Sequence, residues 1–253
     1  MTTETSLDAW ARDSFAAAGI THETFRRGSG PGVVVVHEIP GITPAVIAFA
    51  DEVVAAGFTV VMPSLLGTPG RPLSTGYGLA SMVRMCVARE FTHWATGRTS
   101  PVIAWLRALA RSMHLDCGGP GVGAVGMCFS GGFALGMMVD DVMVAPVLSQ
   151  PSLPLAIGPG RAARSRDVGL SSDDALEVAR RAEEGCQVLG LRFRDDRLVG
   201  ERFDTLRELL GSSFIAVELP SPEPRAHSVL TEQRDETSVR RVIDFLSERL
   251  LTP

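Results

Sequence analysis

The segment Gly126-Met127-Cys128-Phe129-Ser130-Gly131 places a nucleophilic side chain among small residues. It follows a predicted strand over 122–127 and opens a predicted helix over 131–139. A strand–turn–helix junction of this kind lifts a nucleophile above the edge of a sheet. The amide of Phe129 and the helix N-terminus would then face the reacting oxygen, and the helix dipole would favour a thiolate. The pattern predicts nucleophilic catalysis by Cys128, with a buried structural cysteine as the alternative.

A catalytic thiol needs a base and a group that orients this base. His227 is the only histidine after Cys128, and it lies between a predicted strand and the last predicted helix. The acid is expected at the end of the strand over 187–193, where Asp195 and Asp196 follow; solvated charges in a turn are the alternative. The chain has no Asn, so a Cys-His-Asn triad is excluded. The order nucleophile, acid, histidine predicts a Cys-His-Asp triad.

Other patterns argue against a cofactor. Residues 121–126 match the dinucleotide fingerprint GxGxxG, but these glycines interrupt a strand instead of joining a strand to a helix. Cys86, Cys117, Cys128 and Cys186 include no CxxC pair, which argues against a cysteine zinc site. All 24 cations are Arg, which excludes a P-loop lysine or a Schiff base. The sequence therefore implies no metal and no organic cofactor.

Length and composition indicate one globular domain. The chain has 253 residues, 45% hydrophobic and 21% charged, with a net charge of −5. This net negative charge argues against nucleic-acid binding, which requires clusters of basic residues. No apolar run reaches the roughly 18–20 residues of a membrane span. The first ten residues have neither the basic nor the apolar segment of a secretion signal. With unpatterned cysteines in a large chain, these features predict a cytoplasmic protein without nucleic-acid or membrane partners.

Strand-like and helix-like segments alternate along most of the chain. Runs of β-branched residues predict buried strands, and Pro or Gly marks several helix ends. The predicted strands are 33–38, 58–62, 122–127, 142–148, 187–193 and 214–219, and the predicted helices are 44–56, 101–113, 131–139, 173–184, 199–210 and 237–251. This βαβ repetition predicts an α/β fold with a mostly parallel, doubly wound sheet in one domain over residues 1–253.

Three segments fall outside the alternation. Residues 1–20 are predicted to form an extra amphipathic helix. Residues 64–98 are rich in Gly, Pro and Thr and then turn helical, and residues 149–172 form a long connection. Because long loops of α/β domains are often lids, the segment 149–185 is the lid candidate.

Four motifs, in chain order, resemble those of the dienelactone hydrolase family, a branch of the α/β-hydrolases with a cysteine nucleophile. Residues 37–41, His-Glu-Ile-Pro-Gly, resemble the E-I-F-G loop, and the elbow at 126–131 resembles G-x-C-x-G-G. Asp196-Arg197-Leu198-Val199 resembles D-x-x-V, which favours Asp196 over Asp195 as the acid. Ala226-His227-Ser228 resembles the turn that carries the family's histidine. The resemblance runs from about residue 30 to the end and implies the α/β-hydrolase fold.

The resemblance also implies roles for further residues. Glu38 would hold the resting thiol and help to form the thiolate when substrate binds; a helix cap is the alternative. The amide of Ile39 would join that of Phe129 as an oxyanion donor. Arg89, in an Arg-Glu pair, would bind a substrate carboxylate, with a plain salt bridge as the alternative. The second carboxylate-binding arginine of the family falls at Thr231, which puts specificity for dienelactone in doubt.

Four further residues have weaker interpretations. His93 and Trp94 are candidates for lining the pocket, with helix packing as the equal alternative, and His37 is expected to be packed. Ser130 stands where the family has its second elbow glycine and is small enough for the same turn.

The sequence thus predicts a hydrolase of a carboxylic ester or lactone, similar to carboxymethylenebutenolidase, that works through a thioester on Cys128. Its expected partner is the small-molecule substrate. The alternatives are a hydrolase of a neutral ester or thioester, and a non-catalytic binding protein on the same scaffold.

Overall fold

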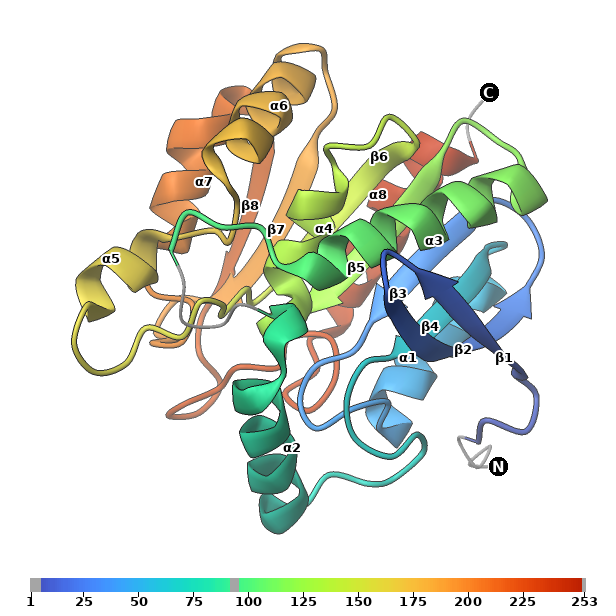
Figure 1. Cartoon of the computed structure of the whole chain (residues 1–253), viewed down its shortest axis with the longest axis horizontal. Coiled ribbons are helices and arrows are strands. Elements are labelled where there is room, and N and C mark those ends of the chain that lie inside the picture. Colours follow the sequence, from blue (N-terminus) through green and yellow to red (C-terminus); the bar gives the residue numbers. More distant parts are fainter. Residues whose placement is uncertain (1–5, 92–95, 252–253) are drawn as a thin grey trace.

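An eight-stranded sheet with strand order β1-β2-β4-β3-β5-β6-β7-β8 forms the centre of the protein (Figure 1). The structure, a computed structural model, describes residues 6–91 and 96–251, without the side chains of residues 86, 87 and 89. Strands β3 to β8 run parallel, and β1 and β2 are antiparallel. The predicted α/β fold with a mostly parallel sheet is confirmed.

The bounds of the elements lie close to the predicted ones from residue 32 onwards. The strands are β1 Ala11–Ala17, β2 Ile20–Gly28, β3 Gly32–Val36, β4 Thr59–Ser64, β5 Val122–Met127, β6 Met143–Ser149, β7 Val188–Phe193 and β8 Phe214–Leu219. The α-helices are α1 Pro44–Ala55, α2 Thr75–Val87, α3 Pro101–Cys117, α4 Gly131–Met137, α5 Arg161–Arg166, α6 Ser172–Glu183, α7 Arg202–Leu210 and α8 Glu236–Leu250. The 3₁₀ turns are η1 Arg89–Phe91, η2 Cys128–Ser130 and η3 Gly211–Ser213.

Continuous valine runs explain why the central strands are covered on both faces. In β3, Val34 and Val36 face a core formed with α3, α4, α6 and α7, whereas Val33 and Val35 face a core formed with α1 and α8. Successive side chains of a strand point to opposite faces, so an unbroken apolar run buries both. Strands β3 and β5 are neighbours at the middle of the sheet, where Val36 pairs with Gly126.

The predicted helix over residues 1–20 is wrong. In the described part of this segment, β1 forms a hairpin with β2, and β2 pairs with β4 in an antiparallel manner. The hairpin turns at Ala18 and Gly19, which both have positive φ. The side chains of β1 are mostly exposed, so the strand has no buried stripe that the sequence pattern could reveal.

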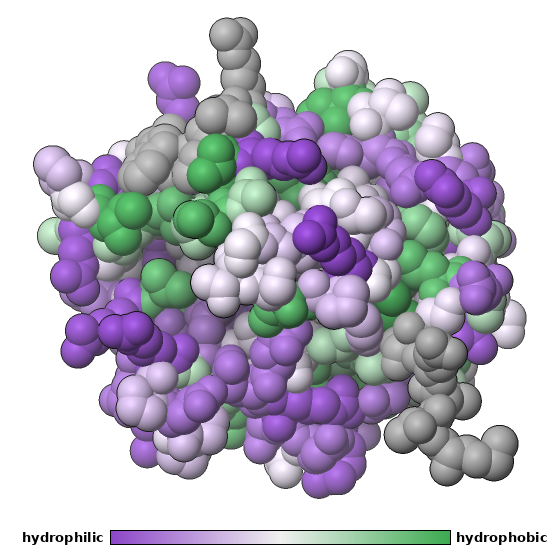
Figure 2. All heavy atoms as spheres, turned by 90° about the horizontal axis from the view of Figure 1, so that it is seen from below, coloured by the Kyte–Doolittle hydropathy of each residue, from purple (hydrophilic) through white to green (hydrophobic). Residues whose placement is uncertain are grey.

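The loops that follow the parallel strands gather at one edge of the sheet, at the bottom of Figure 1. Helix α2 and the connection that follows β6 lie on the same side. From below, hydrophobic groups form separate patches among hydrophilic ones (Figure 2). Leu79, Met82 and Val83 of α2 are exposed. In α/β sheets, binding sites occur at this carboxyl edge. Within the described residues, no helix is both long and apolar enough to cross a membrane.

Candidate active site

Cys128 occupies a strained position directly after β5. Its φ is +55°, in the left-handed region that a residue with a Cβ seldom adopts. The turn is tight because Gly126 has no side chain: a Cβ there would lie 2.2 Å from the carbonyl oxygen of Ser130. A Cβ on Gly131 would lie 2.6 Å from the Cα of Pro151. The two glycines therefore allow a strand–turn–helix junction that presents Cys128 at the carboxyl edge of the sheet.

Ser130 ties this turn to the neighbouring strand. Its hydroxyl oxygen accepts a hydrogen bond from the amide of Met127 at 2.9 Å and lies 3.0 Å from the carbonyl oxygens of both Val36 and His37. Its single proton serves one of these carbonyls at a time. Where the family pattern has a glycine, this chain thus has a fully buried hydroxyl that joins the nucleophile turn to the end of β3.

His37 organises the loop after β3 and is fully buried. Its Nε2 accepts hydrogen bonds from the amides of Leu65 and Leu66 at 3.1 and 3.3 Å, so the proton of the neutral ring is on Nδ1. Nδ1 then donates to the carbonyl oxygen of Glu38 at 2.8 Å. Burial lowers the pKa of His37 from its ordinary 6.5 to about 4, which keeps this arrangement neutral at physiological pH. The residue is packed, as predicted.

His227 and Asp196 form a close pair at the ends of β8 and β7. His227 Nδ1 lies 2.6 Å from Asp196 Oδ2, and Asp196 Oδ1 accepts a hydrogen bond from the amide of Leu198 at 2.9 Å. Asp196 is buried, whereas Asp195 is exposed and its backbone amide contacts Ser221. The structure therefore brings Asp196, and not Asp195, to the histidine.

The second ring nitrogen of His227 faces the nucleophile. Nε2 is buried and, within the described part of the chain, has no nitrogen or oxygen partner with hydrogen-bond geometry. Burial opposes a charged ring, yet the neighbouring Cys128 sulfur and the hydrogen bond to Asp196 raise the pKa of His227 well above its ordinary value. This environment favours an imidazolium beside the sulfur, as in an ion pair of thiolate and histidine.

Glu38 is buried in a cluster of side chains that fix the His227 loop. Its Oε2 accepts hydrogen bonds from Ser228 at 2.7 Å and from Gln150 at 3.3 Å, and its Oε1 accepts one from Thr231. The thiol of Cys128 is not among the hydrogen-bond partners of this carboxylate in the described structure. Glu38 thus contacts the loop that carries the histidine.

One hydrogen-bond partner of the Cys128 sulfur, Ser152, is a residue that the sequence did not reveal. Ser152 Oγ lies 3.4 Å from Cys128 Sγ, and the amide of Ser152 donates to the carbonyl oxygen of Cys128 at 3.0 Å. Ser152 lies in the irregular connection after β6, where no periodic pattern or motif distinguishes one serine from another. A three-dimensional contact with Cys128 is the signal that finds it.

Arg202 holds the Ser152 segment and the Asp196 turn together. Its guanidinium is fully buried and donates only to backbone carbonyl oxygens in the described structure. Burial lowers the pKa of Arg202 to about 10, so the group still carries its charge at neutral pH. The accepting residues are Leu153, Pro154, Arg164, Leu198 and Val199.

The structure describes the positions of only some of the other predicted site residues. Phe129 is buried in η2 directly after Cys128, and Ile39 lies in the loop after β3, next to the elbow because β3 and β5 are paired. The side chain of Arg89, and His93 and Trp94, lie outside the described residues. Glu90, which follows Arg89, has its carboxylate 3.3 Å from Nε2 of His22 on β2. Among the described cysteines, Cys117, Cys128 and Cys186 are free thiols.

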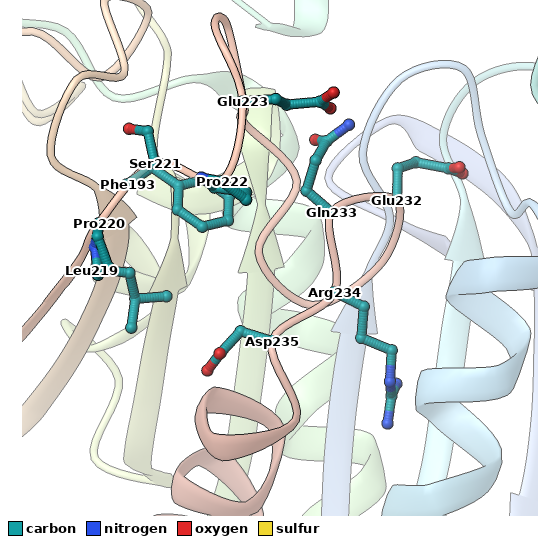
Figure 3. A pocket seen from close by; sticks show the side chains of 10 residues that line it. All are labelled: Phe193, Leu219, Pro220, Ser221, Pro222, Glu223, Glu232, Gln233, Arg234 and Asp235. Atoms are coloured by element: carbon teal, nitrogen blue, oxygen red, sulfur yellow. The ribbon is translucent and has the colours of Figure 1, made fainter.

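Two cavities flank the His227 loop. One, of about 600 Å³, is lined by Asp195, Asp196, Arg197, Leu198, Pro224 and Arg225. The other, of about 720 Å³, is lined by residues 219–223 and 232–235 together with Phe193 (Figure 3). There, the oxygen of the Gln233 side chain accepts hydrogen bonds from the amides of His227 and Ser228 at 3.2 and 3.0 Å. Of the two, the first cavity has Asp196, the partner of His227, in its lining.

Residues 18–150, just over half of the chain, match the model of the dienelactone hydrolase family. The chain belongs to the dienelactone hydrolase family. The matched region contains the Glu38 loop and the Cys128 elbow, and the Asp196–His227 pair follows it. Membership places the protein among hydrolases. No protein with a curated description matches the sequence.

Solved structures share the fold over almost the whole chain. A candidate dienelactone hydrolase from Klebsiella pneumoniae is 16% identical, with a TM-score of 0.64 and coverage of 96% of this chain and 98% of that one. A dienelactone hydrolase from Anabaena variabilis is 14% identical, with a TM-score of 0.62 and coverage of 95% and 98%. A cold-adapted esterase from an Arctic intertidal metagenomic library is 16% identical, with a TM-score of 0.59 and coverage of 94% and 92%. At these identities the likeness shows the fold.

The tight turn at the elbow predicts that Gly126→Ala destabilises the protein. The added Cβ would collide with the Ser130 carbonyl, so the free energy of unfolding should fall by about 3 kcal/mol or more. Gly76→Ala is a matched control, because a Cβ there meets nothing within 4 Å and Ala suits the α2 helix better. Urea unfolding measures both variants. Equal stability of Gly126→Ala and the wild type would contradict the close packing of the turn.

The buried neutral His37 predicts a loss of stability in acid. Unfolded His37 takes up a proton below about pH 6.5, whereas the folded residue does so only below about pH 4. The free energy of unfolding should therefore fall between pH 6.5 and 4 by about 3 kcal/mol from this residue.

His37→Gln removes the titration and keeps an acceptor for the two amides. Urea unfolding of both proteins from pH 8 to 4 should show the wild type losing more stability than the variant below pH 6.5. At pH 8 the two differ only by the cost of the substitution. Parallel curves over the whole range would show that His37 does not titrate in this way.

Proposed function

We propose that the protein hydrolyses a carboxylic ester or lactone through Cys128, His227 and Asp196. The observation that carries this proposal is the 2.6 Å contact between Nδ1 of His227 and the carboxylate of Asp196. The other ring nitrogen of His227 faces the sulfur of Cys128, which lies on the strained elbow. Acyl transfer by a cysteine needs a nucleophile, a base and an acid that orients the base, and the His227–Asp196 pair with Cys128 as its neighbour supports these three roles. Family membership supports a hydrolase.

The first half of the reaction forms a thioester. The Cys128 thiolate attacks the carbonyl carbon, the S–C bond forms, and the π electrons move to the carbonyl oxygen. The amides of Phe129 and Ile39 stabilise this oxyanion; such a donor is typically worth about 3–4 kcal/mol. When the intermediate collapses, the C–O bond breaks and the imidazolium of His227 gives its proton to the leaving alkoxide.

The second half consumes one water. His227, now neutral, takes a proton from this water, and the hydroxide attacks the thioester carbonyl. The C–S bond breaks, and the thiolate and imidazolium are regenerated. The products are an acid and an alcohol, or a single hydroxy acid when the substrate is a lactone. The alternative of a neutral ester or thioester uses the same steps.

The cavity beside Asp196 favours an acyl group that carries a negative charge. Arg197 and Arg225 line this cavity and are exposed, and neither has an ion-pair partner within the described part of the chain. A guanidinium offers two parallel donors to a carboxylate. The preference for acidic substrates is expected to be moderate, since Asp195 lines the same cavity. The role of Arg89 stays a prediction.

The nucleophile is tested by substitution of Cys128. Cys128→Ala should abolish hydrolysis of every ester that the wild type accepts, with its thermal midpoint retained. Cys128→Ser should be poor as well, because a hydroxyl ionises far less than a thiol. Steady-state assays on a panel of aryl esters and lactones measure the loss. Wild-type turnover by Cys128→Ala would eliminate the cysteine mechanism, and a panel on which the wild type is inert would favour a binding protein.

The charge preference is tested with a matched pair of esters that differ by one carboxylate. Arg225→Gln should raise KM for the acidic ester by about tenfold, the lower end expected for one charged hydrogen bond at an exposed site, and barely change KM for the neutral one.

Arg194→Gln is the control, because it removes the same charge from a nearby exposed arginine that does not line the described cavity wall. The kcat/KM ratio for the two esters is compared in all three proteins. If Arg194→Gln and Arg225→Gln reduce the ratio equally, general electrostatics and not a local contact sets the preference.

A further inference from the structure

The sulfur of Cys128 and the hydroxyl of Ser152 face each other in a buried setting. Sγ and Oγ are 3.4 Å apart, within the range of hydrogen bonds to sulfur, and Ser152 is 3% exposed. Either group can donate while the thiol is protonated. Once the sulfur is a thiolate it has no proton left, so the hydroxyl must be the donor. A donor to a charged acceptor is worth about twice as much as one to a neutral acceptor, so this contact favours the thiolate.

The position of Ser152 is fixed from both sides. The amide of Ser152 donates to the carbonyl oxygen of Cys128 at 3.0 Å, which ties the serine to the elbow itself. The next carbonyl groups, of Leu153 and Pro154, accept from the buried guanidinium of Arg202. Arg202 also donates to the carbonyl oxygens of Leu198 and Val199, in the loop that follows Asp196. The main chain of Ser152 is therefore held beside the elbow, where the hydroxyl lies 3.4 Å from the sulfur.

Glu38, which the family resemblance would make the partner of the resting thiol, is bound elsewhere. Three side-chain donors, from Gln150, Ser228 and Thr231, already occupy its two oxygens. Moving the carboxylate toward Cys128 would leave these buried donors unpaired, which is costly. Thr231, which the resemblance aligns with an arginine of the family, is one of these three donors.

We propose that Ser152, and not Glu38, donates the hydrogen bond that stabilises the Cys128 thiolate, in addition to the His227 imidazolium, before substrate arrives. Ser152 is then a catalytic residue, since its hydroxyl touches the reacting sulfur. When the sulfur attacks the substrate, its charge passes to the carbonyl oxygen and the hydrogen bond from Ser152 weakens. The hydroxyl thus increases the fraction of thiolate that is present at neutral pH. This inference rests on the proposed role of Cys128.

The test is the pH dependence of Cys128 alkylation by iodoacetamide, followed by mass spectrometry of the peptide that contains Cys128. Ser152→Ala should shift the midpoint of the profile upward by about one pH unit, as expected for the loss of one hydrogen bond to a charged group. Ser152→Thr keeps the hydroxyl and should restore the wild-type midpoint. Ser165→Ala is the matched control, because this buried serine bonds within α5 at 2.9 Å, and it should not change the profile.

Glu38→Gln completes the set. It removes the charge and keeps the shape of the side chain, and it should move the midpoint by less than Ser152→Ala does. An unchanged midpoint in Ser152→Ala, or a larger shift in Glu38→Gln, would overturn the inference. These outcomes can be distinguished from failure of the proposed function. If the proposed function is wrong, Cys128 of the wild type would react no faster than Cys117 and Cys186 at any pH.

Discussion

The geometry of the site depends on one backbone constraint, the left-handed conformation of Cys128 between β5 and α4. An L-residue at a φ of +55° is strained and persists only where its surroundings hold it. Gly126 and Gly131 provide the room, and the Ser130 hydroxyl ties the turn to the carbonyl groups at the end of β3. Because β3 and β5 are paired, the loop with Ile39 leaves the sheet beside the nucleophile.

Buried polar groups around this turn are satisfied in pairs and clusters. His37 remains neutral because burial lowers its pKa. Two amides donate to its Nε2, and the Glu38 carboxylate receives three side-chain donors. Arg202 keeps its charge although only carbonyl oxygens accept from it in the described structure. A buried group that loses its partners costs far more than the bond contributes. These clusters therefore hold the loops that carry Cys128, Asp196 and His227 in one arrangement.

The sequence was sufficient for the parallel half of the sheet. Valine runs bury both faces of β3, and a proline opens each of α1 and α3, so local signals and the final packing agree there. It failed at the first strand, where exposed side chains give no period of two and the strand is defined by its pairing with β2, which in turn pairs with β4. Tertiary pairing decided the structure of that segment.

The residues of the candidate site also fall into those that the sequence could predict and those that it could not. The position of Cys128 on the elbow and the pairing of Asp196 with His227 could be predicted, because each residue follows a strand and the chain offers few alternatives. Ser152 and Arg202 could not, because their importance comes from contacts across 24 and up to 49 residues of sequence. The partners of Glu38 were also beyond prediction, because Gln150 and Thr231 have meaning only once the loops after β3, β6 and β8 are in contact.

The elbow lies within the residues that match the family model, and the Asp196–His227 pair follows them in the chain. Ser130 ties the elbow to β3, Ser152 contacts the sulfur, and the cluster around Glu38 contacts the histidine loop. In the proposed reaction, Cys128 carries the acyl group during turnover. Rapid acid quench of the enzyme with a slowly hydrolysed aryl ester, followed by intact and peptide mass spectrometry, tests it most directly. The account predicts a transient mass increase of one acyl group, located on Cys128 and removed by hydroxylamine. Turnover without any acyl adduct, or with the adduct on a different residue, would contradict it.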